Sequence, residues 1–262
     1  MKNKTMKLLA ALGVVGGLLG GTGSALAAGG EVHLKHEHWS FDGYTGVYDK
    51  AALRRGLEVY RGVCSACHTL ELVAFRNLSD KGGPELSEED MKAIASEYEV
   101  GTFDEFGEAI TRPAGPADYF PQLYVSDDHA AAMNGGAVPP DLSLMAKARA
   151  HGPDYLYSLL SGYEEEMPEH FELGEGLSYN AYFGGGQLAM AQPLYGDDVE
   201  YADGTEATIE QEARDVAHFL MWAAEPRLEE RKSGGRKAMI FLLILTALTF
   251  VCYRLVWSDV DH

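Results

Sequence analysis

Two cysteines and a histidine in the stretch CSACH, residues 64 to 68, constrain this chain more than any other feature. Cys64 and Cys67 are separated by two small residues, and His68 follows at once. A C-x-x-C pair can form a redox-active disulfide or supply half of a zinc site, and with an adjacent histidine it can attach a haem. Each use requires a different protein around the motif.

The rest of the chain favours haem attachment. The third cysteine, Cys252, lies in an apolar run near the C-terminus, so no second cysteine pair completes a zinc site, and His151 and His170 lack the spacing of a zinc finger. A redox C-x-x-C usually follows a strand, whereas this pair closes a stretch with helical periodicity. In the haem interpretation both thiols bond to the macrocycle and His68 becomes an axial ligand of the iron.

The N-terminal residues have the layout of a secretory signal peptide. A start with three lysines precedes an apolar run, and Ala25-Leu26-Ala27 provides small residues in an A-x-A arrangement. We expect cleavage after Ala27, so that residues 28–226 form an exported haem domain in a bacterial periplasm. A permanent N-terminal anchor is the alternative.

Residues 238–257 form a second apolar run, whose length of about 20 residues suits a membrane-spanning helix. A buried core helix is the alternative, but the run has no polar face. The basic linker 227–237 before it would favour a cytoplasmic N-terminal part. The signal peptide requires the opposite and takes precedence, because a translocating domain crosses largely regardless of loop charge. The expected tail, residues 258–262, is then cytoplasmic.

The chain is strongly acidic, with a formal net charge of −19, and loss of the three signal-peptide lysines makes the mature chain about −22 by the same count. Such a protein repels nucleic acid, so none is expected as a partner, and attracts basic proteins. Two acidic runs, 85–99 and 163–169, are candidates for steering a basic partner. A merely solvated surface is the competing explanation for either run.

Helical signals dominate the exported part, which predicts a mainly α fold. Asp49 is a candidate N-cap for a helix that leads to Cys64, Ser87 starts another helix, and Pro153 opens a third. The last soluble helix is expected at about 209–224.

Long stretches between the expected helices, 101–140 and 162–205, are rich in glycine, proline and aromatic residues. Loops of this length are unusual in a compact domain. We expect them to wrap around a buried group, and a cofactor would serve.

A c-type iron that transfers electrons commonly takes a methionine as its other axial ligand. Met190 lies among small and apolar residues, after a glycine cluster and before the last soluble helix. Met167 precedes a proline, but three carboxylates adjoin it. The residues alone favour Met190 only modestly over Met167. Weaker candidates, on helical stripes, in ambiguous segments or with an imidazole in place of the thioether, are Met91, Met133, Met145, Met221, His129 and His151.

Several blocks, in order, resemble the cytochrome c1 family of the alphaproteobacterial type, the haem subunits of the quinol–cytochrome c oxidoreductase (the cytochrome bc complex, complex III). The resemblance covers nearly the whole mature chain. It implies a mainly α, class I-like c-type cytochrome domain with long loops, one C-terminal transmembrane helix and one covalently attached haem c. The blocks are HWSFDGYTGVYDKAALRRGLEVYRGVCSACH, NGGAVPPDLSLMAKARAHGPDYLYSLLSGY, YNAYFGGGQLAMAQPLY, YADGTEATIEQEARDVAHFLMWAAEP and the C-terminal apolar run.

The resemblance implies roles for individual residues. Cys64 and Cys67 match the thioether cysteines, and His68 matches the proximal iron ligand. Met190, in LAMAQP, matches the family's methionine ligand and is thereby favoured over Met167.

Two further residues receive roles only through the resemblance. Arg149 matches an arginine that pairs with a haem propionate, although the sequence alone would make it an ordinary exposed helix residue. Pro140, rather than Pro139, matches the proline whose carbonyl accepts the N–H of the proximal histidine, a bond that orients the imidazole. Some bacterial relatives tie a loop with an extra disulfide, and this chain has no cysteine to do so.

The function implied by the resemblance is one-electron transfer, by an electron-carrying subunit and not by an enzyme on its own. A Rieske-type iron–sulfur protein would reduce the haem and a basic cytochrome c would collect the electron. Cytochrome b would complete a dimeric complex in the bacterial inner membrane, where the C-terminal helix crosses the lipid bilayer. A stand-alone membrane-anchored cytochrome and a haem enzyme or ligand sensor with a displaceable sixth ligand are the alternatives.

Overall fold

The computed structural model of the chain describes residues 32–163 and 166–258. The expected signal peptide, residues 164–165 of the second acidic run and residues 259–262 of the expected tail lie outside the described residues.

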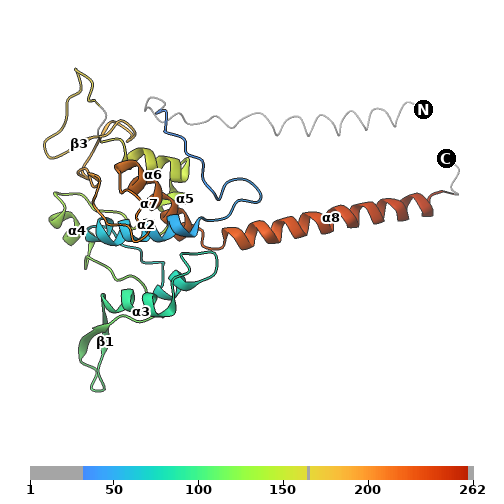
Figure 1. The fold of residues 1–262 in the computed structure, drawn as a ribbon, viewed down its shortest axis with the longest axis horizontal. Coiled ribbons are helices and arrows are strands. Elements are labelled where there is room, and N and C mark those ends of the chain that lie inside the picture. Colours follow the sequence, from blue (N-terminus) through green and yellow to red (C-terminus); the bar gives the residue numbers. More distant parts are fainter. Residues whose placement is uncertain (1–31, 164–165, 259–262) are drawn as a thin grey trace, which may run out of the picture. The chain divides into compact units, whose positions relative to one another are not determined.

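Two helices, α2 (Lys50–Gly62) and α7 (Ile209–Ala224), cross at the centre of the core (Figure 1). The Asp49 carboxylate caps α2 by accepting the N–H groups of the first turn, and the Thr208 hydroxyl caps α7 by accepting the Gln211 N–H. These side chains satisfy backbone donors that have no partner within a helix. Both helices therefore begin where the sequence predicts.

The crossing is close because Gly56 has no side chain. A Cβ at this position would lie 2.1 Å from the carbonyl oxygen of Asp215 and 2.6 Å from Cβ of Phe219. Arg55 strengthens the contact, since its Nε donates to Asp215 Oδ2 at 2.7 Å and the Asp215 side chain is 1% exposed.

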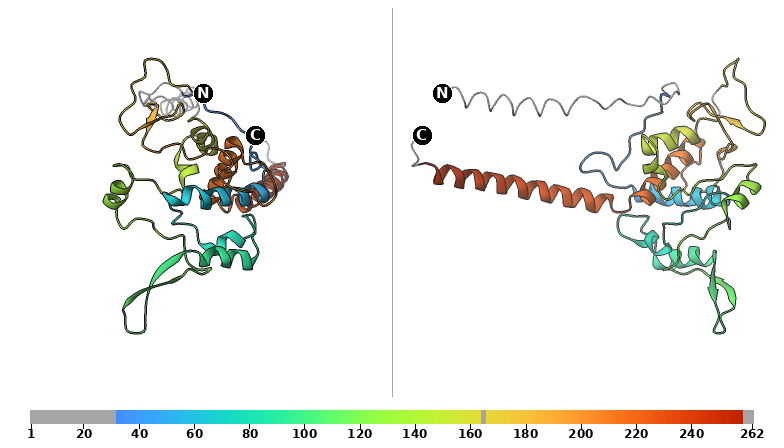
Figure 2. Two further views of the ribbon diagram at one scale, coloured as in Figure 1. Left: turned by 60° about the vertical axis from the view of Figure 1, so that its left-hand side comes forward. Right: turned by 180° about the vertical axis from the view of Figure 1, so that it is seen from behind.

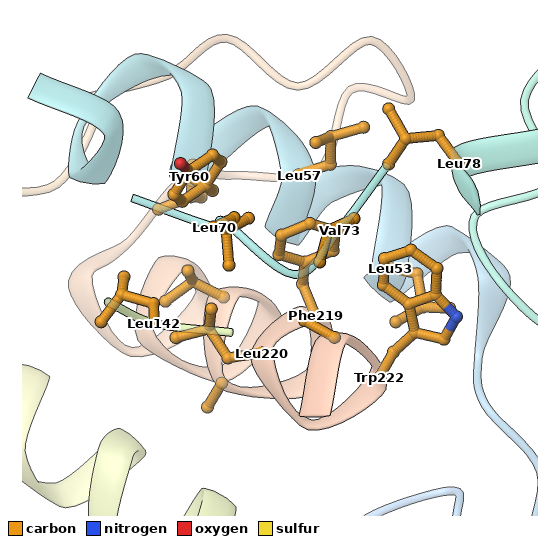
Figure 3. Packing of buried hydrophobic residues seen from close by; sticks show 14 of the residues in the cluster. Leu53, Leu57, Tyr60, Leu70, Val73, Leu78, Leu142, Phe219, Leu220 and Trp222 are labelled. Atoms are coloured by element: carbon orange, nitrogen blue, oxygen red, sulfur yellow. The ribbon is translucent and has the colours of Figure 1, made fainter. Parts of the chain in front are cut away.

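Aromatic and aliphatic side chains from both helices, together with the segment that follows the C-x-x-C-H motif, fill the core (Figure 3). Tyr60 packs edge to face against Phe120, and Phe219 packs against Trp222. Burial of such rings removes a large apolar area from water. The core residues labelled in the figure are Leu53, Leu57, Tyr60, Leu70, Val73, Leu78, Leu142, Phe219, Leu220 and Trp222.

Short elements surround this pair of helices, and the mainly helical class is as predicted. The Ser87 hydroxyl caps α3 by accepting the Asp90 N–H, and Pro153 lies in the first turn of α6, as expected. The elements are η1 (Cys64–Ala66), η2 (Phe75–Ser79), α3 (Glu88–Ser96), β1 (Glu99–Phe103), β2 (Ala109–Pro113), α4 (Asp127–Met133), α5 (Met145–Ala148), α6 (Gly152–Leu160), β3 (Ser178–Tyr179) and β4 (Gln187–Leu188).

The stretch 101–140, expected as a long loop, contains secondary structure of its own. β1 and β2 pair as an antiparallel hairpin, with Glu99 opposite Pro113 and Phe103 opposite Ala109. The Asp104 carboxylate holds the turn by accepting two backbone N–H groups. The hairpin is largely exposed, so its sequence lacks the alternation of apolar and polar residues that predicts a strand with one buried face.

The C-terminal helix α8 (Leu228–Val256) is longer than the expected membrane segment (Figure 2). It is the one helix of the described residues that is long and apolar enough to cross a membrane, with a mean hydropathy of 2.3 over its most apolar window. Its first turns belong to the stretch expected as a basic linker. Lys232 and Arg236 donate to the carbonyl oxygens of Phe41 and Tyr44.

The crossing of α2 and α7 generates a stability prediction. We expect Gly56→Ala to lower the free energy of unfolding by roughly 1–3 kcal/mol or more, because the new methyl group overlaps backbone that cannot move alone. Chemical unfolding of the detergent-solubilised protein measures the effect. The control is Gly101→Ala in β1, where a Cβ has nothing within 4 Å. Equal stability of the two variants would contradict the close approach.

Candidate haem-binding site

The C-x-x-C-H motif lies directly after α2, where the chain leaves the core. The N–H of Val63 still bonds to Val59, and the chain then tightens into the 3₁₀ turn η1. The Cys64 carbonyl accepts the N–H groups of both Cys67, at 3.1 Å, and His68, at 2.9 Å. The turn therefore holds both thiols and the imidazole within one short, ordered segment.

His68 has one ring nitrogen committed and one available. Its Nδ1 lies 2.8 Å from the carbonyl oxygen of Pro140, which can only accept a hydrogen bond, so Nδ1 carries the proton. Burial lowers the pKa of His68, which favours the neutral imidazole. Nε2 is then left with a lone pair, the form in which histidine binds iron.

Asp141, for which no role is predicted from the sequence, positions the carbonyl that His68 contacts. Its Oδ2 accepts the N–H of Glu71 at 2.8 Å and the hydroxyl of Thr69 at 2.9 Å. Its Oδ1 accepts the N–H of Ser143 at 2.9 Å. The bonds to Thr69 and Glu71 join the loop that contains Pro140 to the segment that follows His68, and the bond to Ser143 shapes the loop itself. An acidic residue placed directly after Pro-Pro is the one sequence signal that could have indicated this role.

The two cysteines differ in exposure, since Cys64 is half-buried and Cys67 is exposed. Burial, and then the neighbouring Cys67, raise the pKa of Cys64 to about 12. Exposed apolar side chains flank the contact between His68 and Pro140 in the sequence; they are Leu72, Val138 and Leu144. Free thiols, an imidazole with an available nitrogen and uncovered apolar side chains fit a haem bound at this turn.

Met190 follows β4, in the segment that leads to α7. The Tyr163 hydroxyl donates to the Met190 carbonyl at 3.0 Å, which fixes the backbone of this segment from the end of α6. Gly186, with φ of +74°, lets the chain turn before Met190, where few other residues adopt that conformation. Met167, in contrast, is 47% exposed. Sequence reasoning missed Tyr163, because its contact depends on the path of the intervening loop.

Arg149 and the weaker methionine candidates differ in burial. Arg149 is exposed at the end of α5, and within the described part of the chain its guanidinium has no hydrogen bond or ion pair. Among the described residues, no hydrogen bond or ion pair joins it to His68 or Met190. Of the weaker methionine candidates, Met91 is buried in the core, Met145 and Met221 pack against it, and Met133 is 68% exposed.

Comparison with known proteins shows relatives of similar length. The model of the Cytochrome C1 family matches residues 39–260. The cytochrome c1 of Rhodospirillum rubrum is 44% identical, over 96% of this chain and 97% of that protein. The mitochondrial heme protein cytochrome c1 1 of Arabidopsis thaliana is 48% identical, over 84% of this chain and 71% of that protein.

A longer relative is the cytochrome b/c1 of Bradyrhizobium diazoefficiens, which is 42% identical over 84% of this chain. The chain spans 35% of that protein's length. The family match covers most of the chain and includes the C-x-x-C-H turn, Met190 and α8. The chain therefore belongs to the cytochrome c1 family, whose members carry covalently attached haem c.

Proposed function

We propose that this haem protein is the electron-transfer subunit of a membrane-bound cytochrome b–c1 complex. It would receive single electrons from a Rieske-type iron–sulfur protein and pass them to a cytochrome c. The observation that carries the proposal is the pairing of His68 with the Pro140 carbonyl on the turn that also bears both thiols. The family match over residues 39–260 supports it.

The haem assignment follows from the same turn. Cys64 and Cys67 would hold the macrocycle through thioether bonds, and His68 and Met190 would be the axial ligands of the iron. The bound haem supplies one-electron oxidation and reduction. The protein supplies a neutral, oriented imidazole through Pro140 and a methionine segment held at its backbone by Tyr163.

Arg149 would pair with a haem propionate. Support comes from its guanidinium, which is exposed and has no acidic partner among residues 32–163 and 166–258. A guanidinium is planar and always charged, and it binds carboxylates through two parallel hydrogen bonds.

The haem domain would occupy the periplasmic side of the bacterial inner membrane, with residues 28–226 exported and 238–257 crossing the bilayer. The exposed apolar surface and length of α8 support a single-pass anchor. Residues 227–237 would form a basic, helical connection at the membrane surface. Thr246, Ala247 and Thr249 are small residues that allow close packing against other helices of the complex, which would be dimeric and include cytochrome b.

The acidic runs differ in their own ion pairs. In the first run, Lys50 pairs with Glu85, Lys92 with Glu88 and Arg61 with Glu97, at 2.5–2.7 Å. These pairs cancel part of the negative field of the run.

In the loop that continues the second run, ion pairs do not compensate the negative charges in this way. Four glutamates of this loop are exposed and have no ion pair within the described residues. We call them the acidic loop; they are Glu166, Glu169, Glu172 and Glu175. The segment begins beside Tyr163, which contacts Met190. We therefore propose the acidic loop, and not residues 85–99, as the surface that docks a basic cytochrome c.

The proposed function predicts which proteins accompany this chain in a membrane complex. Detergent extraction should co-purify the chain with a di-haem cytochrome b and an iron–sulfur protein, and a pyridine haemochrome test should show c-type haem in the chain. A chain that carries c-type haem but purifies alone would support the stand-alone cytochrome, and a chain without c-type haem would overturn the assignment.

The axial-ligand proposal predicts different behaviour for two methionines. Met190→Ala should leave the reduced iron able to bind carbon monoxide and should lower the reduction potential, because a thioether ligand stabilises reduced iron. Met167→Ala, the matched control, should resemble the wild type. Optical spectra of the reduced protein with and without carbon monoxide measure the difference, and the reverse result would assign the ligand to Met167.

The docking proposal predicts which charges affect the rate of cytochrome c reduction. Replacement of the four glutamates of the acidic loop by glutamine should slow the reaction at low ionic strength and flatten its dependence on salt. The control replaces Glu88, Glu89, Asp90 and Glu99 by their amides and should have a smaller effect. A wild-type rate that does not fall with salt would show that charge does not steer the partner.

A further inference from the structure

One carboxyl group that the proposed electron transfer does not use lies in the core. Glu212, near the start of α7, is 0% exposed. Its Oε1 accepts the N–H of Asp198 at 3.0 Å, whereas Oε2 has no hydrogen-bond partner among the described residues. A buried oxygen without a partner costs free energy, and far more so when it is charged.

The nearest charged neighbour of Glu212 is another carboxylate. Asp198 Oδ2 accepts the backbone N–H groups of Tyr195 at 2.6 Å and Gly196 at 3.0 Å, and these bonds hold the side chain in place. Burial, and then the adjacent Asp198, raise the pKa of Glu212 to about 7. Glu212 therefore changes its protonation state in the neutral range, where an ordinary glutamate is fully ionised.

No cation among the described residues compensates Glu212. Arg55, from α2, is already paired with Asp215 and Asp203, each at 2.7 Å. Glu58, also from α2, has a pKa raised mainly by burial. The titratable groups that face this part of the core from α2, η1, the 195–205 loop and α7 are Arg55, Glu58, Cys64, Asp198, Tyr201, Asp203 and Asp215.

This carboxyl group lies beside the turn that would bear the haem. Val199, next to Asp198, packs on the end of α2, since a Cβ on Gly62 would lie 2.9 Å from Val199 Cγ1. Cys64 follows two residues later and packs against the same core. The charge of Glu212 is close enough to contribute to the raised pKa of Cys64.

We propose that Glu212 is a redox-linked proton-binding site, which takes up a proton when the haem is reduced and releases it when the haem is oxidised. The proposal rests on the haem attachment proposed at Cys64. On reduction, one electron from the iron–sulfur donor converts ferric to ferrous haem, and one proton from solvent converts the Glu212 carboxylate to the acid. Both steps reverse on oxidation.

Coulomb repulsion links the two events. The added electron raises the free energy of a nearby negative carboxylate, so Glu212 binds its proton more tightly in the reduced protein. For two partly screened charges inside a protein, the proton affinity rises roughly tenfold. At pH values between the pKa of Glu212 in the oxidised protein and its pKa in the reduced protein, reduction of the haem is therefore accompanied by uptake of a proton. The reduction potential must fall as pH rises through this interval and level off on either side.

Redox titration of the full-length holoprotein in detergent, at a series of pH values across the neutral range, tests the proposal. The wild type should show the fall in potential, and Glu212→Gln, which keeps the shape but cannot ionise, should lose it. Glu210→Gln removes an exposed charge from the same helix and should keep the wild-type slope. Asp198→Asn removes the repelling charge and should move the slope to lower pH.

A spectroscopic measurement separates Glu212 from the haem propionates, which all variants retain. The reduced-minus-oxidised infrared spectrum should gain the carbonyl band of a protonated carboxyl group in the wild type and Glu210→Gln, and Glu212→Gln should lack it. An unchanged slope and band in Glu212→Gln would overturn the proposal. Should that variant fail to fold, an Asp198→Asn slope identical to that of the wild type would overturn it.

The haem content distinguishes failure of this proposal from failure of the proposed function. If both the wild type and Glu212→Gln contain c-type haem and have the same reduction potential at every pH, only the proton-binding proposal fails and the electron-transfer role stands. A pyridine haemochrome test that finds no c-type haem would remove both.

Discussion

The close packing of α2 against α7 at Gly56 determines where the functional groups of this protein can lie. Because the backbones nearly touch, α2 cannot shift along α7 without a clash at Asp215 or Phe219. The end of α2, and with it the C-x-x-C-H turn, is thereby placed against the core. The ion pair between Arg55 and Asp215 supports this packing from within.

Local and long-range hydrogen bonds together shape the site. The 3₁₀ turn is local: hydrogen bonds to the Cys64 carbonyl shape it whatever the distant chain does. The contact between His68 and Pro140 is long-range and depends on Asp141, which joins the two segments by accepting hydrogen bonds from Thr69 and Glu71. A ligand ring held in this way needs little reorganisation when the charge of a bound iron changes, which suits repeated electron transfer.

The sequence predicts the parts of the structure that depend on neighbouring residues. The helix beginnings at Asp49 and Ser87 are predictable because a capping side chain acts within three residues. The thiols and His68 are predictable because haem attachment requires them in one short motif. The Asp141 and Tyr163 contacts depend on the paths of loops, and the exposed β1–β2 hairpin has no buried face to impose an alternating pattern. The environment of Glu212 arises only when α7 meets the 195–205 loop.

The two central helices lie far apart in the sequence, at residues 50–62 and 209–224, and this separation sets the order of events during synthesis. Residues 50–62 leave the ribosome long before residues 209–224, so α2 has no partner until almost the whole domain has been made. Contacts between such distant segments form slowly, because a long stretch of chain must first be ordered. Until α7 is made, the core that half-buries Cys64 in the folded protein is incomplete, so this thiol is more accessible to a haem than it is in the finished domain.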